Sequence, residues 1–362
     1  LHGDDKLFTF DEPRNLQRLC IFSGQDIFAD SRLCSTRVNS LMFYAQEDEM
    51  LRSGFPKFLF LFFKRLRVLD LRQFCLHGEL PSEIELLSEL RYLAIHLSAN
   101  SIPSSVGNLS HLETFIVQAG GNVLLPDTIW NLKKLRRLDA RNGFTFNWAE
   151  ENLGSLHNLD SISVLVLSSV QSEKILEKFP NIRRLKCRLF KSEEYNGDCN
   201  KIVAMGFLSQ LESLKLDHPR RYHLEFRFQL MNLKKLSLSY FHWSEIPMIG
   251  KLCSLEVIKL DREVSPQGTW DMEGFEFPRL KYLKLEQLRI FRWKCSSDQF
   301  PRLRKLVLVR CWRLKEVPSC FGEVSTLEMI EVHGCSDSVV SSLWEIEEEQ
   351  KDSGNEDFQI FV

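Results

Sequence analysis

The 362-residue sequence has no apolar run long enough to cross a membrane, and its charges nearly balance. Its most apolar stretch, Phe58–Phe63, is six residues long, whereas a transmembrane helix needs about 20. Lys and Arg number 47 and Asp and Glu number 49, giving a net charge of -2. A balance of this kind gives no general reason to expect a nucleic acid or a membrane as partner.

The short motifs of common enzymes are also missing. There is no phosphate loop of the Gly-x-x-x-x-Gly-Lys-Ser/Thr type, because the pair Gly250-Lys251 lacks both the upstream glycine and the following hydroxyl residue. No HExxH, no GxSxG and no ligand-spaced group of Cys and His occurs. We therefore expect no enzymatic activity, no cofactor and no bound metal.

The ten cysteines form no CxxC pair and show no regular spacing, so we expect reduced thiols and not a zinc site or a disulfide framework. The sequence starts with neither Met nor a charged-then-apolar leader. We expect a cytoplasmic chain cut from a longer protein, which reaches a membrane or the nucleus only through other parts of that protein.

One phrase is repeated throughout the chain. Phe300–Val309 reads FPRLRKLVLV, and FPRLKYLKLE at 277–286 is the same phrase with other polar residues. In both, leucine occupies the first, fourth and sixth places, counted from Leu303 and from Leu280. This is the signature of leucine-rich repeats, in which each repeat contributes one short strand.

Fourteen such phrases follow one another at steps of 22 to 29 residues, within the range for this repeat. Their first places are Leu16, Val38, Leu66, Leu90, Leu112, Leu135, Leu159, Ile182, Leu211, Leu233, Leu255, Leu280, Leu303 and Leu327. Several repeats continue with an apolar residue and proline, as at Pro81, Pro103 and Pro126. Proline fixes its own φ and can open a helical turn, so we expect a short helical or 3₁₀ segment there.

These features predict an α/β repeat solenoid, a horseshoe with a concave parallel sheet of about 14 short strands and an irregular, 3₁₀ or short-helical convex side. The predicted solenoid covers 1–337, with irregular initial repeats over 1–65 and regular ones over 66–337. An acidic C-terminal cap or tail covers 338–362. Seven acidic residues between 344 and 357 predict that this last part is frayed.

The third, fifth and seventh places of each phrase should face outward on the concave side, since side chains alternate along a strand. The seventh repeat places Ser161, Ser163 and Leu165 there. The rows on either side are basic and consist of Arg137, Asp139, Arg141, Arg184, Lys186 and Arg188. Two interpretations stay open, a solvated face and a docking patch for an acidic protein surface.

Aromatic residues just past the strands of the C-terminal half form a second candidate set. They are Tyr240, Phe241, Trp243, Phe291, Trp293 and Trp312. Such rings either form the rim of a protein-binding surface or pack beneath the loops.

The chain resembles the repeat domain of plant intracellular immune receptors that carry a nucleotide-binding module. The resemblance rests on the irregular repeat, on the apolar residue followed by proline, and on Cys311 and Cys335 at the ninth place. The opening RLCIFS (18–23) is similar to the start of that domain. The ending EIEEEQKDSGNEDFQIFV resembles the late-blight-resistance group of the coiled-coil class. The nucleotide-binding motifs themselves are missing from this chain.

The resemblance implies a role in innate immunity. The domain would sense a pathogen effector or an effector-modified host protein, hold the receptor's own nucleotide-binding module inactive until then, and trigger a hypersensitive response. The alternative is the substrate-recognition solenoid of an F-box-type ubiquitin ligase adaptor, which an upstream F-box would reveal. An extracellular receptor ectodomain would need cap cysteines and an Asn ladder, and is disfavoured.

Overall fold

The structure is a computed structural model. It describes residues 17–21, 38–43, 60–61, 63–146, 154–168, 172–190, 203–204, 208–217, 226–227, 230–241, 243, 246–263 and 268–362. The chain forms two compact units, Leu1–Gly154 and Ser155–Val362, which we call unit 1 and unit 2. Much of the predicted irregular initial part, 1–65, lies outside the described residues.

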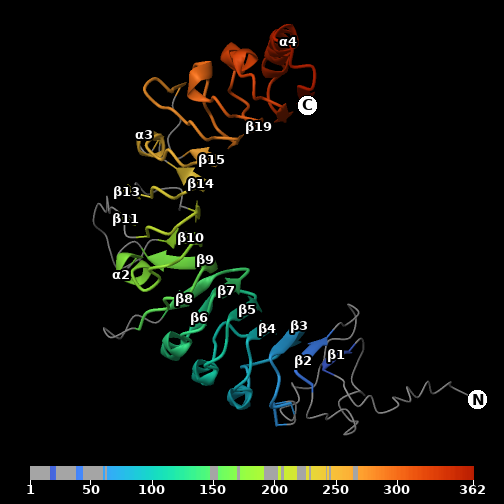
Figure 1. The fold of residues 1–362 in the computed structure, drawn as a ribbon, viewed down its shortest axis with the longest axis vertical. Helices are drawn as coiled ribbons and strands as arrows, with labels where there is room; N and C mark the ends of the chain where they lie inside the picture. Colours follow the sequence, from blue (N-terminus) through green and yellow to red (C-terminus); the bar gives the residue numbers. More distant parts are fainter. Residues whose placement is uncertain are drawn as a thin grey trace, which may run out of the picture. The chain divides into compact units, whose positions relative to one another are not determined.

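Unit 1 is built on a parallel sheet with one strand from each of the first six phrases (Figure 1). The strands are β1 (Arg18–Ile21), β2 (Ser40–Phe43), β3 (Val68–Leu76), β4 (Tyr92–Leu97), β5 (Thr114–Ala119) and β7 (Arg137–Ala140). Residues at the same place of neighbouring phrases lie opposite each other in the sheet. Leu69, for example, at the fourth place, lies between Leu41 and Leu93. All three leucines are buried, so the repeat stacks its apolar residues in columns.

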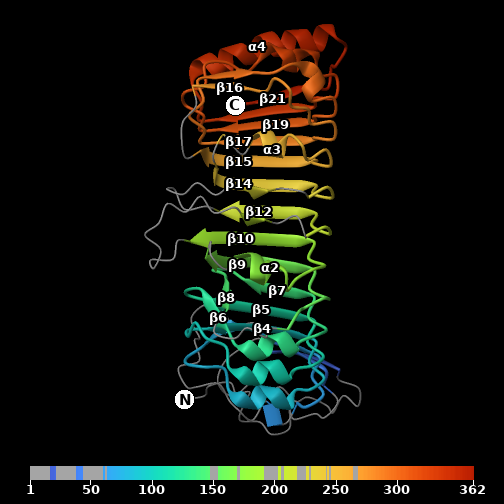
Figure 2. The ribbon, with the colours of Figure 1, turned by 90° about the vertical axis from the view of Figure 1, so that its left-hand side faces the viewer.

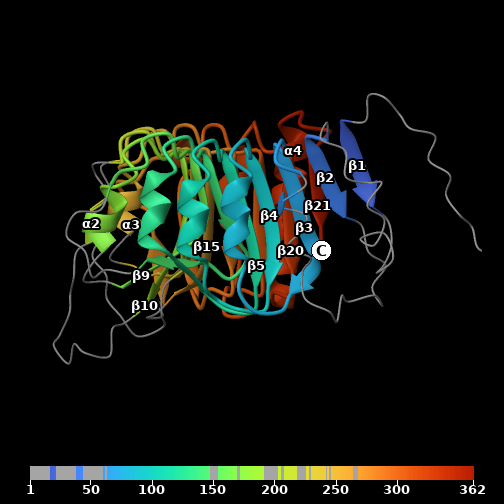
Figure 3. The same cartoon turned by 90° about the horizontal axis from the view of Figure 1, so that it is seen from below.

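Proline opens the 3₁₀ turns on the other side of this sheet. Pro81, Pro103 and Pro126 precede η3 (Ser82–Leu86), η4 (Ser104–Asn108) and η5 (Asp127–Asn131), and each carbonyl accepts the N–H of the third residue on. The three turns lie side by side in Figure 3. Gly107 permits this contact, because a Cβ there would lie 2.4 Å from the Cβ of Thr128. The short strands β6 (Val123–Leu125) and β8 (Phe144–Phe146) pair beside the turns.

Unit 2 continues the pattern with the remaining eight phrases and one further strand (Figure 2). Its strands are β9 (Ser161–Ser168), β10 (Arg184–Phe190), β12 (Ser213–Asp217), β14 (Lys235–Phe241), β15 (Val257–Glu263), β17 (Tyr282–Glu286), β19 (Lys305–Val309), β20 (Met329–His333) and β21 (Gln359–Phe361). All pairings are parallel, and Leu283 and Leu306 are buried as the repeat requires. The predicted leucine-rich-repeat solenoid is therefore confirmed.

Leu165 of unit 2 departs from the predicted alternation. The register between β9 and β10 shifts, so that Cys187 stands opposite Leu165 and not opposite Val164. A bulge adds one residue to a strand and reverses the faces beyond it. Leu165 is therefore fully buried, and its predicted outward position was wrong.

The eighth place of the last five phrases adopts the left-handed conformation. Its φ is between 51° and 60° at Tyr240, Arg262, Gln287, Arg310 and Gly334. This turn directs the ninth side chain inward, where Phe241, Leu288 and Cys311 are buried, as is the carboxylate of Glu263. Glu263 accepts hydrogen bonds from the N–H of Arg289 at 2.8 Å and from its Nε at 3.2 Å.

The side of unit 2 away from the sheet holds a stack of aromatic rings. The paired strands β16 (Thr269–Asp271) and β18 (Arg292–Lys294) bring Trp270 and Trp293 into register, with ring centroids 5.0 Å apart. Trp243 extends the stack on one side at 5.5 Å and Phe321 on the other at 5.1 Å. The remaining elements here are β11 (Val203–Ala204), β13 (Phe226–Arg227), α2 (Ser172–Leu176), α3 (Ile246–Ile249), η7 (Ser297–Gln299) and η8 (Ser319–Glu323).

The acidic C-terminal segment is ordered, contrary to prediction. Helix α4 (Asp337–Asp352) buries Val339, Leu343, Ile346 and Gln350 on one face, and β21 pairs with β20. The Gln350 amide donates to the carbonyls of Phe321 and Val324 at 2.8 and 3.0 Å. Acidic residues of the helix such as Glu345 and Glu348 are exposed, so a high acidic content did not prevent a packed helix.

Candidate functional site

The face of unit 2 that carries the third, fifth and seventh places, called here the open face, bears a row of lysines. Strand pairing sets Lys186 opposite Lys215, and Lys259 opposite Lys284, with Ser237 between the two pairs. Neighbouring strands lie about 4.8 Å apart, so the four lysines extend over roughly 19 Å. We call Lys186, Lys215, Lys259 and Lys284 the lysine column.

A row of carboxylates runs beside the lysine column. Asp217, Asp261 and Glu286 occupy the seventh place of three strands, each two residues after a lysine. Two residues on one strand face are about 6.6 Å apart, so cations and anions form two adjacent lines. We call these three carboxylates the acidic row.

Two lysines of the column have local contacts that favour their charged form. Glu286 accepts a hydrogen bond from Lys284 Nζ at 2.6 Å and so raises the pKa of this lysine. Lys259 Nζ lies 5.3 Å from the centre of the Tyr282 ring, which attracts a cation. Lys215 and Lys259 are exposed. Burial raises the pKa of Asp261, and the nearby Arg262, at 3.1 Å, opposes this effect.

The predicted basic row of β10 is on the open face. Arg184, Lys186 and Arg188 are exposed or half-buried, while Leu185 and Cys187 between them are buried. Arg184 pairs with Asp160, and Arg188 Nε lies 3.6 Å from Asp217 Oδ2. These ion pairs reduce the positive charge of the row.

The predicted row of the sixth repeat belongs to unit 1. Arg137 and Asp139 form an ion pair at 2.6 Å, and Arg141 is exposed. The predicted stripe joins this row to residues of unit 2, and its continuity stays a prediction.

The predicted aromatic set separates into two groups. Trp243 and Trp293 are 8% and 4% exposed and belong to the internal ring stack, so of the two interpretations packing beneath the loops applies to them and a binding rim does not. Trp312 is 59% exposed. Tyr240 is half-buried, and its ring lies 5.4 Å from the guanidinium carbon of Arg262.

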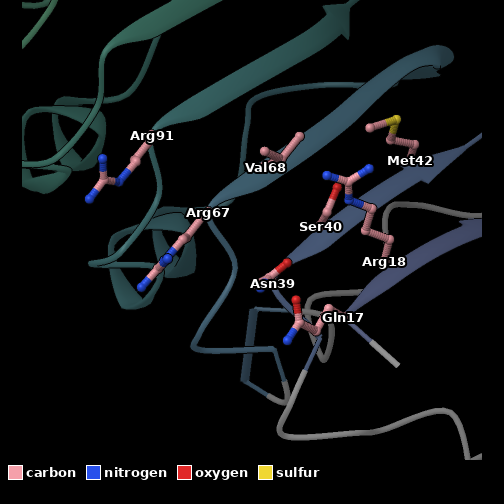
Figure 4. A pocket seen from close by; sticks show the side chains of 8 residues that line it. All are labelled: Gln17, Arg18, Asn39, Ser40, Met42, Arg67, Val68 and Arg91. Carbon is pink, nitrogen blue, oxygen red and sulfur yellow. The ribbon is translucent and has the colours of Figure 1, made fainter. Parts of the chain in front are cut away.

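Unit 1 has a separate pocket of about 570 Å³ at the start of its strands. Figure 4 shows its arginines, Arg18, Arg67 and Arg91, on three neighbouring segments. Arg91 also pairs with Glu113 at 3.2 Å. The other lining residues are Gln17, Asn39, Ser40, Met42 and Val68.

Sequence reasoning identified Lys186 but missed Lys215, Lys259 and Lys284 of the lysine column, although the sequence contains a signal for them. The phrase ends in Lys-Leu-Asp at 215–217 and 259–261 and in Lys-Leu-Glu at 284–286. Comparing the fifth and seventh places of all phrases would have revealed both rows. Among the described residues, no group of three or more His, Cys, Asp or Glu side chains could hold a metal ion, and no helix is long and apolar enough to span a membrane.

The stacked phrases, the parallel strands and the charged open face define a leucine-rich-repeat solenoid. The chain belongs to the leucine-rich repeat region family, whose model matches residues 37–334. An internalin from Listeria monocytogenes shares the fold, with a TM-score of 0.53 and 14% identity over 96% of this chain and 86% of that one.

Proteins similar in sequence are plant disease-resistance proteins. A putative late blight resistance protein homolog of Solanum demissum is 35% identical over 361 residues, which cover 94% of this chain and 46% of that protein. A late blight resistance protein of the same species is 37% identical over 315 residues, covering 83% of this chain and 24% of that protein. The chain thus spans from about a quarter to about half of the length of these relatives.

Proposed function

We propose that this chain is the non-catalytic protein-recognition region of a cytoplasmic plant disease-resistance protein. Its open face in unit 2 binds an acidic surface of a pathogen effector or of an effector-modified host protein. Binding releases a nucleotide-binding module elsewhere in the full-length receptor, which the chain otherwise holds inactive, and a hypersensitive response follows. The names of the similar proteins support the resistance role, and the lysine column supports the choice of face.

The lysine column favours an acidic partner for an electrostatic reason. Neighbouring lysines about 4.8 Å apart lie within one Debye length, about 8 Å at physiological salt, so their potentials add, and the acidic row, about 6.6 Å away, offsets part of this sum on its own side. An approaching carboxylate relieves the mutual repulsion of Lys186 and Lys215, or of Lys259 and Lys284, as well as gaining its own attraction.

The acidic row contributes specificity. A partner that places carboxylates over the lysine column also meets Asp217, Asp261 and Glu286 on one side. A partner with a uniformly acidic surface is repelled there, whereas one with cations beside its carboxylates is accepted in one orientation. Charge patterns of this kind select partners and fix orientation more than they add affinity.

The test is a charge reversal within the full-length receptor, Lys215→Glu with Lys259→Glu. Both side chains are exposed on the open face, so the variant should fold and accumulate like the parent. We expect it to lose the cell-death response to the matching pathogen. The matched control reverses two exposed lysines in turns, Lys134→Glu with Lys251→Glu, and should respond normally. An accumulated column variant that still responds like the parent contradicts the proposal.

A further inference from the structure

The strongest feature outside the open face is a pair of thiols on the opposite side of unit 2. Cys295 directly precedes Ser296, the residue that caps η7, and Cys320 is the second residue of η8. The two sulfur atoms are 2.9 Å apart, although 25 residues separate them in the sequence. Both thiols are half-buried, which leaves them accessible to a small molecule.

The surroundings hold both thiols in place. The capping box of η7 fixes the backbone after Cys295, since the N–H of Ser296 donates to Gln299 Oε1 at 3.0 Å, and Gln299 Nε2 donates to the Met272 carbonyl at 2.6 Å. Ser297 of η7 donates to Glu323 of η8 at 2.7 Å. The two segments are therefore joined by a hydrogen bond next to the thiols.

We propose that Cys295 and Cys320 form an oxidative modification site, at which a peroxide converts the two thiols into a disulfide between neighbouring repeats. A disulfide bond is about 2.05 Å long, so each sulfur needs to move by less than about 1 Å. This inference rests on the geometry of the pair alone and is independent of the proposed function.

The chemistry balances with hydrogen peroxide as the oxidant. The hydrogen bond to Cys320 and burial both raise the pKa of Cys295, so Cys295 is the poorer nucleophile of the pair, and Cys320, once its proton has left to solvent, supplies the attacking sulfur. Cys320 sulfur attacks one peroxide oxygen, the O–O bond breaks, and the sulfenic acid and hydroxide form. Cys295 sulfur then displaces the hydroxyl group as water and forms the S–S bond, so that two thiols and one peroxide give one disulfide and two waters.

A second pair of cysteines in neighbouring repeats provides the competing outcome. Cys311 and Cys335 occupy the ninth place of the last two phrases, and a hydrogen bond from Cys311 lowers the pKa of Cys335 to about 7. Cys311 is fully buried, however, and its sulfur also donates toward the carbonyls of Leu285 and Val309, both at 3.6 Å. Because its side chain points inward, Cys311 is less able than Cys295 to attack a sulfenic acid on a neighbouring cysteine.

The experiment is peptide mapping of the full chain without reduction. The reduced protein is treated with hydrogen peroxide, its free thiols are blocked with N-ethylmaleimide, and it is digested with trypsin and Glu-C. Glu-C is needed because trypsin leaves Cys320 and Cys335 in one peptide, 316–351. We expect peptide 295–302 linked to peptide 317–323, with the loss of two hydrogen atoms, and recovery of both peptides after dithiothreitol.

Variants distinguish a specific pair from general oxidation. Cys253→Ser removes an exposed thiol elsewhere and should leave the cross-link unchanged. Cys320→Ser should abolish the cross-link. If this variant misfolds, the peptide map of the unmutated protein still decides whether the cross-link forms. The proposal is overturned if peptides 295–302 and 317–323 are recovered only as blocked thiols or as separate higher oxides. It is equally overturned if the only link joins Cys311 to Cys335.

Discussion

Truncating Trp293 tests the difference between an internal ring stack and a binding rim. The indole lies between Trp270, with centroids 5.0 Å apart, and Phe321, at 5.1 Å. Its Nε1 donates to the sulfur of Met272 at 3.1 Å. The change Trp293→Ala therefore removes a buried side chain, three ring contacts (the third with Phe300 at 6.5 Å) and one hydrogen bond from the inside of unit 2.

The expected loss of stability is large. Truncation of a buried Trp to Ala costs about 3–5 kcal/mol, because the cavity closes only partly. Each well-placed ring pair contributes about 0.5–1.5 kcal/mol beyond burial. We expect the free energy of unfolding to fall by about 4 kcal/mol. Trp312→Ala, which removes a 59% exposed ring, should change it by no more than about 0.5 kcal/mol.

The assay is urea unfolding of the full chain, followed by far-ultraviolet circular dichroism so that the lost fluorophore does not matter. A double-mutant cycle with Trp270 should give a coupling of about 0.5–1.5 kcal/mol, as expected for stacked rings. If Trp293→Ala unfolds at the same urea concentration as Trp312→Ala, the ring stack has no structural role and the core assignment is wrong.

Three further results are expected. Leu236→Ala, in the middle of the leucine column, should cost about 2–5 kcal/mol in urea unfolding, with hydrogen exchange increased mainly in adjacent repeats. Gly334→Ala should cost about 1–2 kcal/mol, because φ is 60° there and a Cβ disfavours that conformation; an unchanged unfolding midpoint would argue against it. Hydrogen bonds from Lys305 and then His333 lower the pKa of Glu331, so its stabilising effect is present above the unfolded pKa of about 4.3 and is lost as pH falls through the folded pKa. In Glu331→Gln the free energy of unfolding should consequently fall less steeply as the pH is lowered than it does in the parent. The same pH dependence in both proteins would contradict this.

The repeat itself could be predicted from the sequence because its signal is a spacing. Leucines at the first, fourth and sixth places allow only one register, so strands such as β17 and β19 and the burial of Leu283 and Leu306 follow directly. The 3₁₀ turns after proline could be predicted for a similar reason, since Pro81 acts on the residues next to it in the sequence.

Features that depend on contacts between repeats were not predictable in this way. The bulge that buries Leu165 depends on how β9 meets β10. The positions of Trp243 and Trp293 depend on rings of neighbouring repeats that stack against them.

The C-terminal helix was missed for a different reason. Val339, Leu343, Ile346 and Gln350 follow helical spacing, and all are buried. The seven acidic residues between 344 and 357 concealed this pattern, because a count of charges does not record which face of a helix they occupy.

The left-handed turn at the eighth place has a consequence for how such a protein changes over generations. Its conformation is set by the backbone, and four different residue types, Tyr, Arg, Gln and Gly, occupy it in the last five phrases. Arg262 links neighbouring repeats there, with Gln287 Oε1 at 2.9 Å and the ring of Tyr240 at 5.4 Å. Repeats with Tyr, Arg or Gln at this place keep the same register and the same buried leucines. Substitution at these positions therefore changes the border of the open face without rebuilding the repeat.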